Sequence, residues 1–246
     1  MHKIKAVLLS VLWTVTMLIF PVSSGIIVSV LEMSQIPILL TQGSFMLASL
    51  VVPFMYIRNK KISFKNFGLR PMEKQRKIKN LFLPLVLAEL PLIVTGVDFV
   101  GFTYIISLAF FAIAVGVSEE VYFRGIILKL LENSFTVKKA IAISALIFGV
   151  GHFASVLSAD NIAAVLLQVI NAIVFGVIAA EIVVITKGLF PVIIWHFLFN
   201  FVNRITPGHG TNFIAAIAIQ EVILIAYAVF LWRVITDRKE DEPLGN

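Results

Sequence analysis

Two adjacent glutamates and an arginine interrupt a long apolar stretch of this sequence. Glu119, Glu120 and Arg124 stand in GVSEEVYFRG, directly after FTYIISLAFFAIAVG, which carries no charge. Residues four apart share a face of an α-helix, so Glu120 and Arg124 can form an ion pair. Glu119 points about 100° away from Glu120, because a helix turns once every 3.6 residues or so. The spacing therefore leaves Glu119 available as a general base that activates water.

Two later apolar stretches each place a histidine one helical turn from a second side chain. Phe148 and His152 are four apart in FGVGH, so the phenyl ring can hold the imidazole in place. His196 and Asn200 are four apart in WHFLFN, and both can donate hydrogen bonds to a developing oxyanion. Taken singly, each motif also fits a structural role, as a buried ion pair, a packed histidine or a polar contact between helices.

The composition is that of a polytopic α-helical membrane protein. Hydrophobic residues make up 59% and charged residues 14% of the 246 positions, whereas soluble domains carry about 25% charged residues. The net charge of +6 does not indicate nucleic-acid binding, because the basic residues gather at the ends of apolar segments. The absence of cysteine excludes disulfides, thiol catalysis and cysteine-bound metals.

Eight apolar segments are predicted to form membrane helices and must position these side chains. A charge within such a helix costs ~2.5–3.5 kcal/mol on insertion scales, so the buried charges mark a functional site. Gly149 and Gly151 predict a close contact of their helix with a neighbour. The predicted helices span residues 5–30, 36–57, 80–97, 102–130, 139–157, 161–186, 189–204 and 212–234.

The distribution of lysine and arginine predicts that both termini are cytoplasmic. With the N-terminus inside, 18 of the 20 Lys and Arg residues fall on cytoplasmic segments, and the loop 58–79 alone holds nine. This loop can also lie as a basic amphipathic segment on the anionic inner leaflet. We expect the first apolar segment to be retained as a membrane helix, a cleaved signal peptide being the alternative.

The three motifs, in this order and on separate apolar helices, resemble the CPBP family of intramembrane proteases. This family includes the CAAX prenyl endopeptidases of the Rce type and the abortive-infection and bacteriocin-immunity proteins. The similarity covers roughly residues 103–205, and the eight-helix pattern also resembles the prenyl-protease branch. The signature positions of the family are occupied by Glu119, Glu120, Arg124, Phe148, His152, His196 and Asn200.

The resemblance implies an intramembrane endopeptidase that hydrolyses a membrane-associated, prenylated or hydrophobic peptide. Glu119 then activates the attacking water together with His152, while His196 and Asn200 stabilise the oxyanion. Glu120, Arg124 and Phe148 are the supporting residues. At about 1.5 Å per residue, the candidate residues lie roughly 10–20 Å from the cytoplasmic helix ends. We therefore expect a polar cavity that is reached from the cytoplasmic half of the membrane.

A catalytic metal is the less favoured alternative. The family is often described as metalloproteases, and zinc accepts nitrogen and oxygen ligands such as Glu119, His152 and His196. However, the sequence has no H-E-x-x-H motif, and the pairing of Glu120 with Arg124 occupies one possible ligand. We therefore predict a glutamate-type peptidase without a cofactor.

The chain divides into three predicted parts, each containing membrane helices. They are the N-terminal helices with the basic loop 58–79 (residues 1–101), the catalytic helices (102–205), and the last helix with a charged tail (206–246). The expected partners are the lipid bilayer, in a prokaryotic plasma membrane, and a hydrophobic or lipidated peptide, but no nucleic acid. Two alternative functions remain: a non-catalytic immunity or peptide-binding protein using the same fold, and a transporter.

Overall fold

The computed structural model describes residues 2–69, 78–158, 161–206 and 211–241, and every regular element within these ranges is helical. The all-helical class predicted from the composition is confirmed. In chain order the elements are α1 (Lys3–Val30), α2 (Gln35–Ser49), α3 (Val51–Asn59), α4 (Phe64–Phe67), α5 (Ile78–Val94), α6 (Phe102–Glu120), η1 (Val121–Ile127), α7 (Leu128–Glu132), α8 (Val137–Gly151), η2 (His152–Ser158), α9 (Ile162–Thr186), α10 (Phe190–Ile205) and α11 (Thr211–Asp241).

Six helical segments in the described residues are long and apolar enough to cross a membrane. They are Lys3–Val30, Gln35–Asn59, Phe102–Glu132, Val137–Leu157, Ile162–Thr186 and Asn212–Thr236. The other two predicted membrane helices are also present, but their apolar parts, Leu81–Val94 and Phe190–Ile205, are shorter. A full crossing takes about 20 residues, so these two can cross the hydrocarbon core only where it is thin. The count of eight membrane helices remains a prediction.

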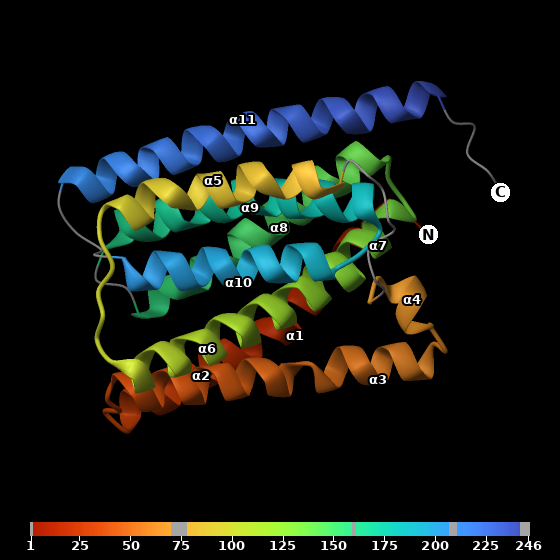
Figure 1. Cartoon of the computed structure of the whole chain (residues 1–246). Coiled ribbons are helices and arrows are strands. Elements are labelled where there is room, and N and C mark those ends of the chain that lie inside the picture. The colour runs from red at the N-terminus through yellow and green to blue at the C-terminus, as the bar shows by residue number, and fades with distance from the viewer. Residues whose placement is uncertain (1, 70–77, 159–160, 207–210, 242–246) are drawn as a thin grey trace.

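The long helices run side by side in one bundle, with α6 between α2 and α10 (Figure 1). On the other side of the bundle, α8 packs against α9, and α11 lies across α5 and α9. The element α6 continues through η1 into α7 without a break, so one long helix carries Glu119, Glu120 and Arg124. Residues of α6, η1, α8, α9 and α10 dominate the main core.

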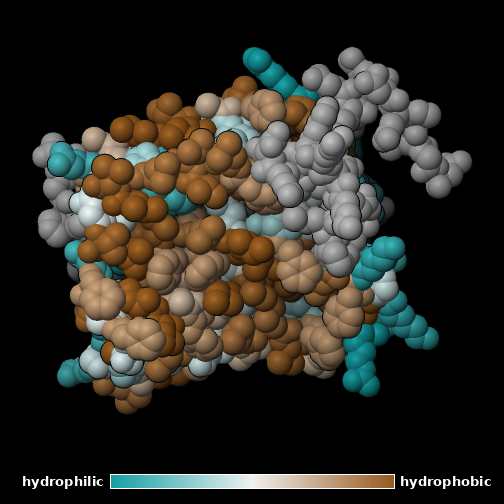
Figure 2. Space-filling view, viewed as in Figure 1, coloured by the Kyte–Doolittle hydropathy of each residue, from teal (hydrophilic) through white to brown (hydrophobic). Residues whose placement is uncertain are grey.

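The outer surface of the bundle is apolar, whereas several charged side chains lie inside it. Large apolar side chains such as Leu8, Leu83 and Leu167 are exposed, and they form a band between more hydrophilic ends (Figure 2). Glu120 and Arg124, by contrast, are fully buried. A lipid environment explains this pattern, because hydrocarbon covers the apolar outside while the charges pair within the bundle. The chain is therefore an integral, multi-pass membrane protein.

One end of the bundle, called the basic end here, collects basic residues from segments that are far apart in the sequence. The N-terminus, α4 and α7 all lie at this end (Figure 1). Lys65, Lys129 and Lys187 line one hollow there, and Lys3 and Lys139 line another. The connections after α1 and α5 and the C-terminal end of α10 lie at the opposite end. By the positive-inside rule, this arrangement agrees with a cytoplasmic location of the basic end.

The contact between α8 and α9 depends on Gly149. A Cβ atom at this position would overlap Cγ1 of Ile173 and lie 2.9 Å from the carbonyl oxygen of Val169. At Gly151, by contrast, a Cβ atom would meet only Cγ2 of Thr14, at an ordinary contact distance of 3.5 Å. The predicted close approach is therefore found at Gly149, where small size lets two helix backbones meet.

We predict that Gly149→Ala destabilises the protein while Gly151→Ala does not. The methyl group at residue 149 must push α9 away, and overpacking of this kind costs about 1–3 kcal/mol. The thermal unfolding midpoint of each variant in detergent, measured against the wild-type chain, provides the test. Equal midpoints for the two variants would show that the α8–α9 contact does not need the glycine.

Candidate active site

The two glutamates lie where the α-helix widens into a π-helix. Glu119 and Glu120 are the last residues of α6, and the π-helical element η1 begins at Val121. Such π-helical turns are rare and occur frequently at functional sites. The sequence pattern did not reveal this change of helix type. It alters the direction of the side chains that follow Glu120, including Arg124.

The predicted ion pair between Glu120 and Arg124 is present and fully buried. Nη1 of Arg124 donates to Oε1 of Glu120 at 3.0 Å, and Nη2 donates to the carbonyl oxygen of Gly176 at 3.3 Å. The second bond connects the pair to α9. Charge-assisted hydrogen bonds are shorter and stronger than neutral ones, and they are needed here because an unpaired buried charge is very costly.

Phe148 contacts both Arg124 and His152. The guanidinium carbon of Arg124 lies 4.5 Å from the centre of the Phe148 ring, which is a cation–π distance. The ring of His152 packs edge-on against Phe148 with a centroid distance of 4.7 Å, as the four-residue spacing predicted. Phe123 adds another edge-on contact to Phe148 at 4.8 Å. The phenyl ring thus connects the buried ion pair with the histidine.

His196 bridges the two glutamates, a contact that the sequence did not predict. Its Nδ1 lies 2.7 Å from Oε1 of Glu120, and its Nε2 lies 3.6 Å from Oε2 of Glu119. Gly116 allows this approach, because a Cβ atom there would lie 3.4 Å from Cβ of His196 and 3.3 Å from the backbone nitrogen of Phe197. Glu120 Oε1 therefore receives hydrogen bonds from Arg124 and from His196.

Phe175 is a further site residue that the sequence reasoning missed. Its ring stacks on Trp195 at 4.1 Å and packs against His196 at 4.5 Å. It also lies 5.8 Å from the guanidinium carbon of Arg124. The one signal in the sequence is the neighbouring Gly176 within a long apolar run, since such a glycine often marks a close approach to another group.

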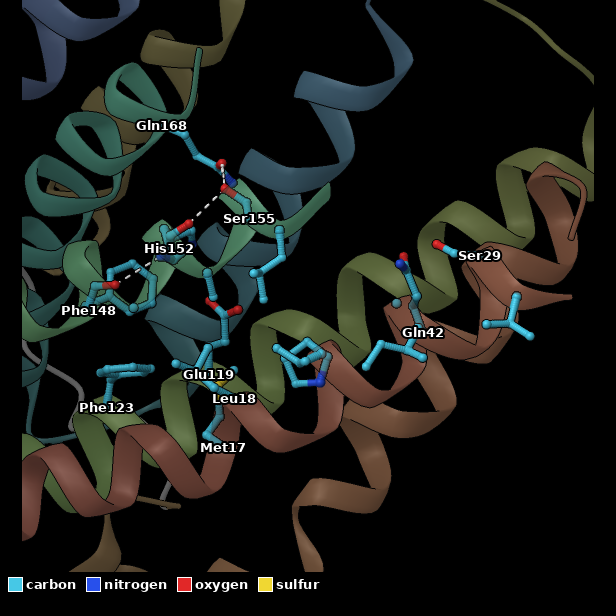
Figure 3. Close-up of a pocket in the computed structure, with 18 residues that line it drawn as sticks. Met17, Leu18, Ser29, Gln42, Glu119, Phe123, Phe148, His152, Ser155 and Gln168 are labelled. Carbon is cyan, nitrogen blue, oxygen red and sulfur yellow. Dashed lines mark hydrogen bonds between the residues drawn. The ribbon is translucent and has the colours of Figure 1, made fainter. Parts of the chain in front are cut away.

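A cavity of about 600 Å³ lies beside this network and contains the side chains of Glu119 and His152. The carboxylate of Glu119 points toward His152 across this space (Figure 3). Phe123 and Phe148 line the cavity at its inner end, and most of the remaining wall is apolar. Oε2 of Glu119 is buried and has no hydrogen-bond partner among the described residues. The carboxylate of Glu119 thus lies between His196, 3.6 Å from Oε2, and a space large enough for part of a peptide.

The predicted direction of access is wrong for this cavity. It extends along α1 from Met17 to Val30, away from the basic end, and it reaches Gln42 of α2 and Gln168 of α9. On the other side of Glu119, Phe67 of α4 covers Gly125 of the π-helix. The depth of a residue in the membrane does not predict the direction of access. That direction depends on which neighbouring elements cover each side of its side chain.

His152 is held in one orientation by its own backbone surroundings. Its Nδ1 donates to the carbonyl oxygen of Phe148 at 3.0 Å, since a carbonyl oxygen can only accept. Nε2 of a neutral ring is then left with its lone pair. Ser155 donates to the carbonyl oxygen of His152 or to Oε1 of Gln168, both at 2.8 Å. These bonds fix η2, the 3₁₀-helix that begins with His152.

Asn200 lies one helical turn after His196 on α10 and is partly buried. It has no hydrogen-bond partner among the described residues, and neither Asn200 nor His196 lines the cavity. The predicted oxyanion pair therefore shares a helix face, but only His196 contacts another residue of the site. The role of Asn200 remains a prediction.

Within the described residues, no group of three or more His, Asp or Glu side chains is arranged to hold a metal ion. Oε1 of Glu120 already accepts hydrogen bonds from Arg124 and His196. Of the three residues considered as ligands, Glu119 and His152 line the cavity, whereas His196 faces the two carboxylates.

Other buried acidic residues lie outside this site. Glu89 of α5 accepts a hydrogen bond from Gln220 of α11 at 2.9 Å. Glu181 of α9 is fully buried, and neither of its carboxylate oxygens has a hydrogen-bond partner within the described residues. None of these three residues lines the cavity. Glu89 and Glu181 are therefore matched control positions. They test whether activity depends on any buried carboxylate or on one that lines the cavity.

Comparison with known protein families identifies the central segment. Residues 101–202 match the family model described as Type II CAAX prenyl endopeptidase Rce1-like. The match includes all seven signature residues, from Glu119 to Asn200, and it confirms the resemblance that the motifs predicted. Among curated proteins and among solved structures, no match was found.

We predict that Arg124→Met destabilises the protein by about 3–5 kcal/mol, because it leaves the buried Glu120 without its cation. The double variant Glu120→Gln/Arg124→Met removes both charges and should regain much of that loss. Arg204→Met is the control, since the Arg204 guanidinium stacks on Phe111 and has no carboxylate partner among the described residues. Thermal unfolding in detergent measures all three. If Arg124→Met is as stable as the control, Arg124 is not needed to stabilise the buried charge of Glu120.

Proposed function

We propose that this chain, whose residues 101–202 belong to the Rce1-like type II CAAX prenyl endopeptidase family, hydrolyses peptide bonds within the membrane by means of Glu119. One observation carries the proposal. Glu119 lines an internal cavity and its carboxylate makes no hydrogen bond among the described residues, while the adjacent Glu120 is held by Arg124 and His196. A buried carboxylate that is kept out of the structural ion pair is suited to act as a general base.

In the proposed reaction, Glu119 and His152 hold a water molecule between them. Glu119 accepts a proton as the water oxygen attacks the carbonyl carbon of the substrate. The resulting tetrahedral intermediate then collapses, the carbon–nitrogen bond breaks, and the proton passes to the leaving amine. The products are a carboxylate and an amine, and no covalent enzyme intermediate forms. The fixed orientation of His152, with Nδ1 bonded to Phe148, supports this role, because Nε2 can accept a hydrogen bond from the water.

The developing oxyanion requires a hydrogen-bond donor close to the attacked carbon. His196 is suited to this, because its Nε2 lies 3.6 Å from Oε2 of Glu119 and its Nδ1 is bonded to Glu120. With both ring nitrogens protonated, Nδ1 donates to Glu120 while Nε2 donates to an oxygen that is held beside Glu119. Asn200 is proposed as the second donor on the strength of the family resemblance and its position one turn from His196.

We propose that the reaction needs no metal ion. Among the described residues, no three His, Asp or Glu side chains are arranged to hold a metal ion, and Oε1 of Glu120 is engaged by its two partners. The proposed substrate is a hydrophobic or prenylated peptide, since the cavity wall is mostly apolar and an extended peptide or a lipid chain can occupy it.

We predict that Glu119→Gln lowers the rate of peptide hydrolysis by about 10²–10⁴-fold, because the amide cannot accept the proton of the water. A fluorogenic peptide with a prenylated CAAX end, assayed with the purified chain in detergent or lipid, measures this rate. Glu181→Gln is the matched control, since Glu181 is also buried but does not line the cavity. We expect this control to cleave at the wild-type rate.

Wild-type activity in the Glu119 variant would rule out the proposed base. If wild-type protein binds the peptide without cleaving it, a peptide-binding function replaces the catalytic one. Treatment of the wild-type protein with a strong chelator should leave the rate unchanged. A rate that is lost with the chelator and restored by zinc would overturn the metal-free mechanism.

We predict that Asn200→Ala lowers kcat by about 10²–10³-fold with little change in KM, because an oxyanion donor acts mainly in the transition state. Asn203→Ala is the control on the same helix, since Asn203 donates to the carbonyl oxygen of Phe199 and is not a signature residue. Steady-state kinetics on the same peptide separate the two parameters. A rise in KM at constant kcat would assign Asn200 to substrate binding instead.

A further inference from the structure

A second, smaller cavity lies at the basic end and is separate from the proposed catalytic cavity. It encloses about 270 Å³ between α4, η1, α7 and the end of α9. Its wall differs in character from the apolar wall beside Glu119, because charged and polar side chains from four segments meet there. They are Lys65, Asn66, Arg124, Lys129, Glu132 and Lys187.

Hydrogen bonds hold the outer wall of this cavity in place. Ser63 accepts a hydrogen bond from the backbone nitrogen of Asn66 and so caps α4, and Gly68 ends α4 with a left-handed φ of 104°. The carbonyl oxygen of Gly68 accepts a hydrogen bond from the backbone nitrogen of Leu189 at 2.9 Å. Lys129 donates to the carbonyl oxygen of Asn66. Side-chain and backbone bonds thus join α4 to α7 and to the start of α10.

The close approach of α4 to the π-helix depends on Gly125. A Cβ atom on Gly125 would lie 2.5 Å from Cζ of Phe67, whose side chain is buried. The ammonium nitrogen of Lys129 lies 5.3 Å from the centre of the same ring. Phe67 therefore brings the polar residues of α4 over the helix that carries Arg124.

The side chains around the cavity carry a net positive charge. Four cationic side chains line it, and the carboxylates of Glu120 and Glu132 offset two of them. The backbone at Lys187 is left-handed, with φ of 56°, where α9 ends. Concave surfaces with fixed cations attract anions, and those at a cytoplasmic helix end attract the headgroups of anionic lipids.

One buried donor of this wall lacks a partner. Arg124 is only 1% exposed, and its Nη1 and Nη2 are bonded to Glu120 and Gly176. Its Nε is buried and has no hydrogen-bond partner in the part of the chain that the structure describes. Because Nε is covered, an anion in the cavity would stabilise this guanidinium through its charge and not through a hydrogen bond to Nε.

We propose that this cavity binds the phosphate group of an anionic membrane lipid. The phosphate oxygens accept hydrogen bonds from the ammonium groups of Lys65 and Lys187, while the acyl chains extend along the apolar surface of the bundle. The position agrees with a lipid source, because Glu132 and Lys187 stand at or just beyond the ends of two membrane-crossing segments. Free phosphate has the same chemistry and is the alternative source.

A bound phosphate would also affect the proposed active site without entering its cavity. Arg124 connects the two regions, because it lines the basic cavity and is bonded to Glu120, which is in turn bonded to His196. The lipid would then act as a positioning group that restrains the guanidinium. The binding site itself does not depend on the proposed hydrolytic function, and its test uses binding and stability as readouts.

The test compares the full-length wild-type chain with Lys65→Gln/Lys187→Asn in detergent. Asparagine is chosen at position 187 because it tolerates a left-handed backbone. Each protein is titrated with short-chain phosphatidylglycerol, with the matching phosphatidylcholine and with inorganic phosphate, and the thermal midpoint is recorded. We expect phosphatidylglycerol to raise the wild-type midpoint, and the double variant to need at least about tenfold more of it, given the contribution of each basic residue at a membrane surface.

Lys139→Gln is the control, because Lys139 is also at the basic end but lines a different hollow. It should respond to phosphatidylglycerol like the wild type. An equal response to inorganic phosphate, again lost in the double variant, would assign the cavity to a soluble phosphate rather than a lipid. The proposal is overturned if the double variant responds like the wild type, or if phosphatidylcholine is as effective as phosphatidylglycerol.

Discussion

The carboxylate of Glu120 is the point on which the rest of the site depends. It accepts hydrogen bonds from Arg124 on the same helix and from His196 on α10, and Arg124 is bonded in turn to Gly176 on α9. In an apolar bundle neither charge can turn to solvent, so each requires its partner. These bonds join the three elements to one another. The network therefore determines the relative positions of α6, α9 and α10 at the level of the cavity.

The same network explains why two adjacent glutamates can differ in function. Glu120 is engaged on one side of the helix, whereas Glu119 points into the cavity with one oxygen unpartnered. Aromatic rings hold the surrounding groups in place: Phe148 lies between Arg124 and His152, and Phe175 lies between Trp195 and His196. Because rings have few rotatable bonds, they fix the polar groups at a small cost in conformational entropy.

Sequence spacing predicted the contacts within a single helix but not those between helices. The pairs Glu120–Arg124 and Phe148–His152 were both predicted from a separation of four residues, and both are present. The bridge from His196 to the two glutamates joins residues more than seventy positions apart, and no local pattern contains it. The same limit applies to Phe175, whose contacts lie on other helices, and to the direction of the cavity, which depends on where α1 and α4 pack.

The sequence by itself determined that this protein is a helical membrane protein and which residues are the candidates for its chemistry. Long apolar runs must form helices in lipid, because every backbone polar group has to be bonded within its own segment. Charged residues within those runs are too costly to be incidental, and their order revealed the family resemblance. Only the tertiary structure decided which glutamate is held in the hydrogen-bond network and which lines the cavity. Packing placed His196 beside Glu120, exposed Glu119 to the cavity and brought α4 over Arg124, because these positions depend on contacts between distant segments.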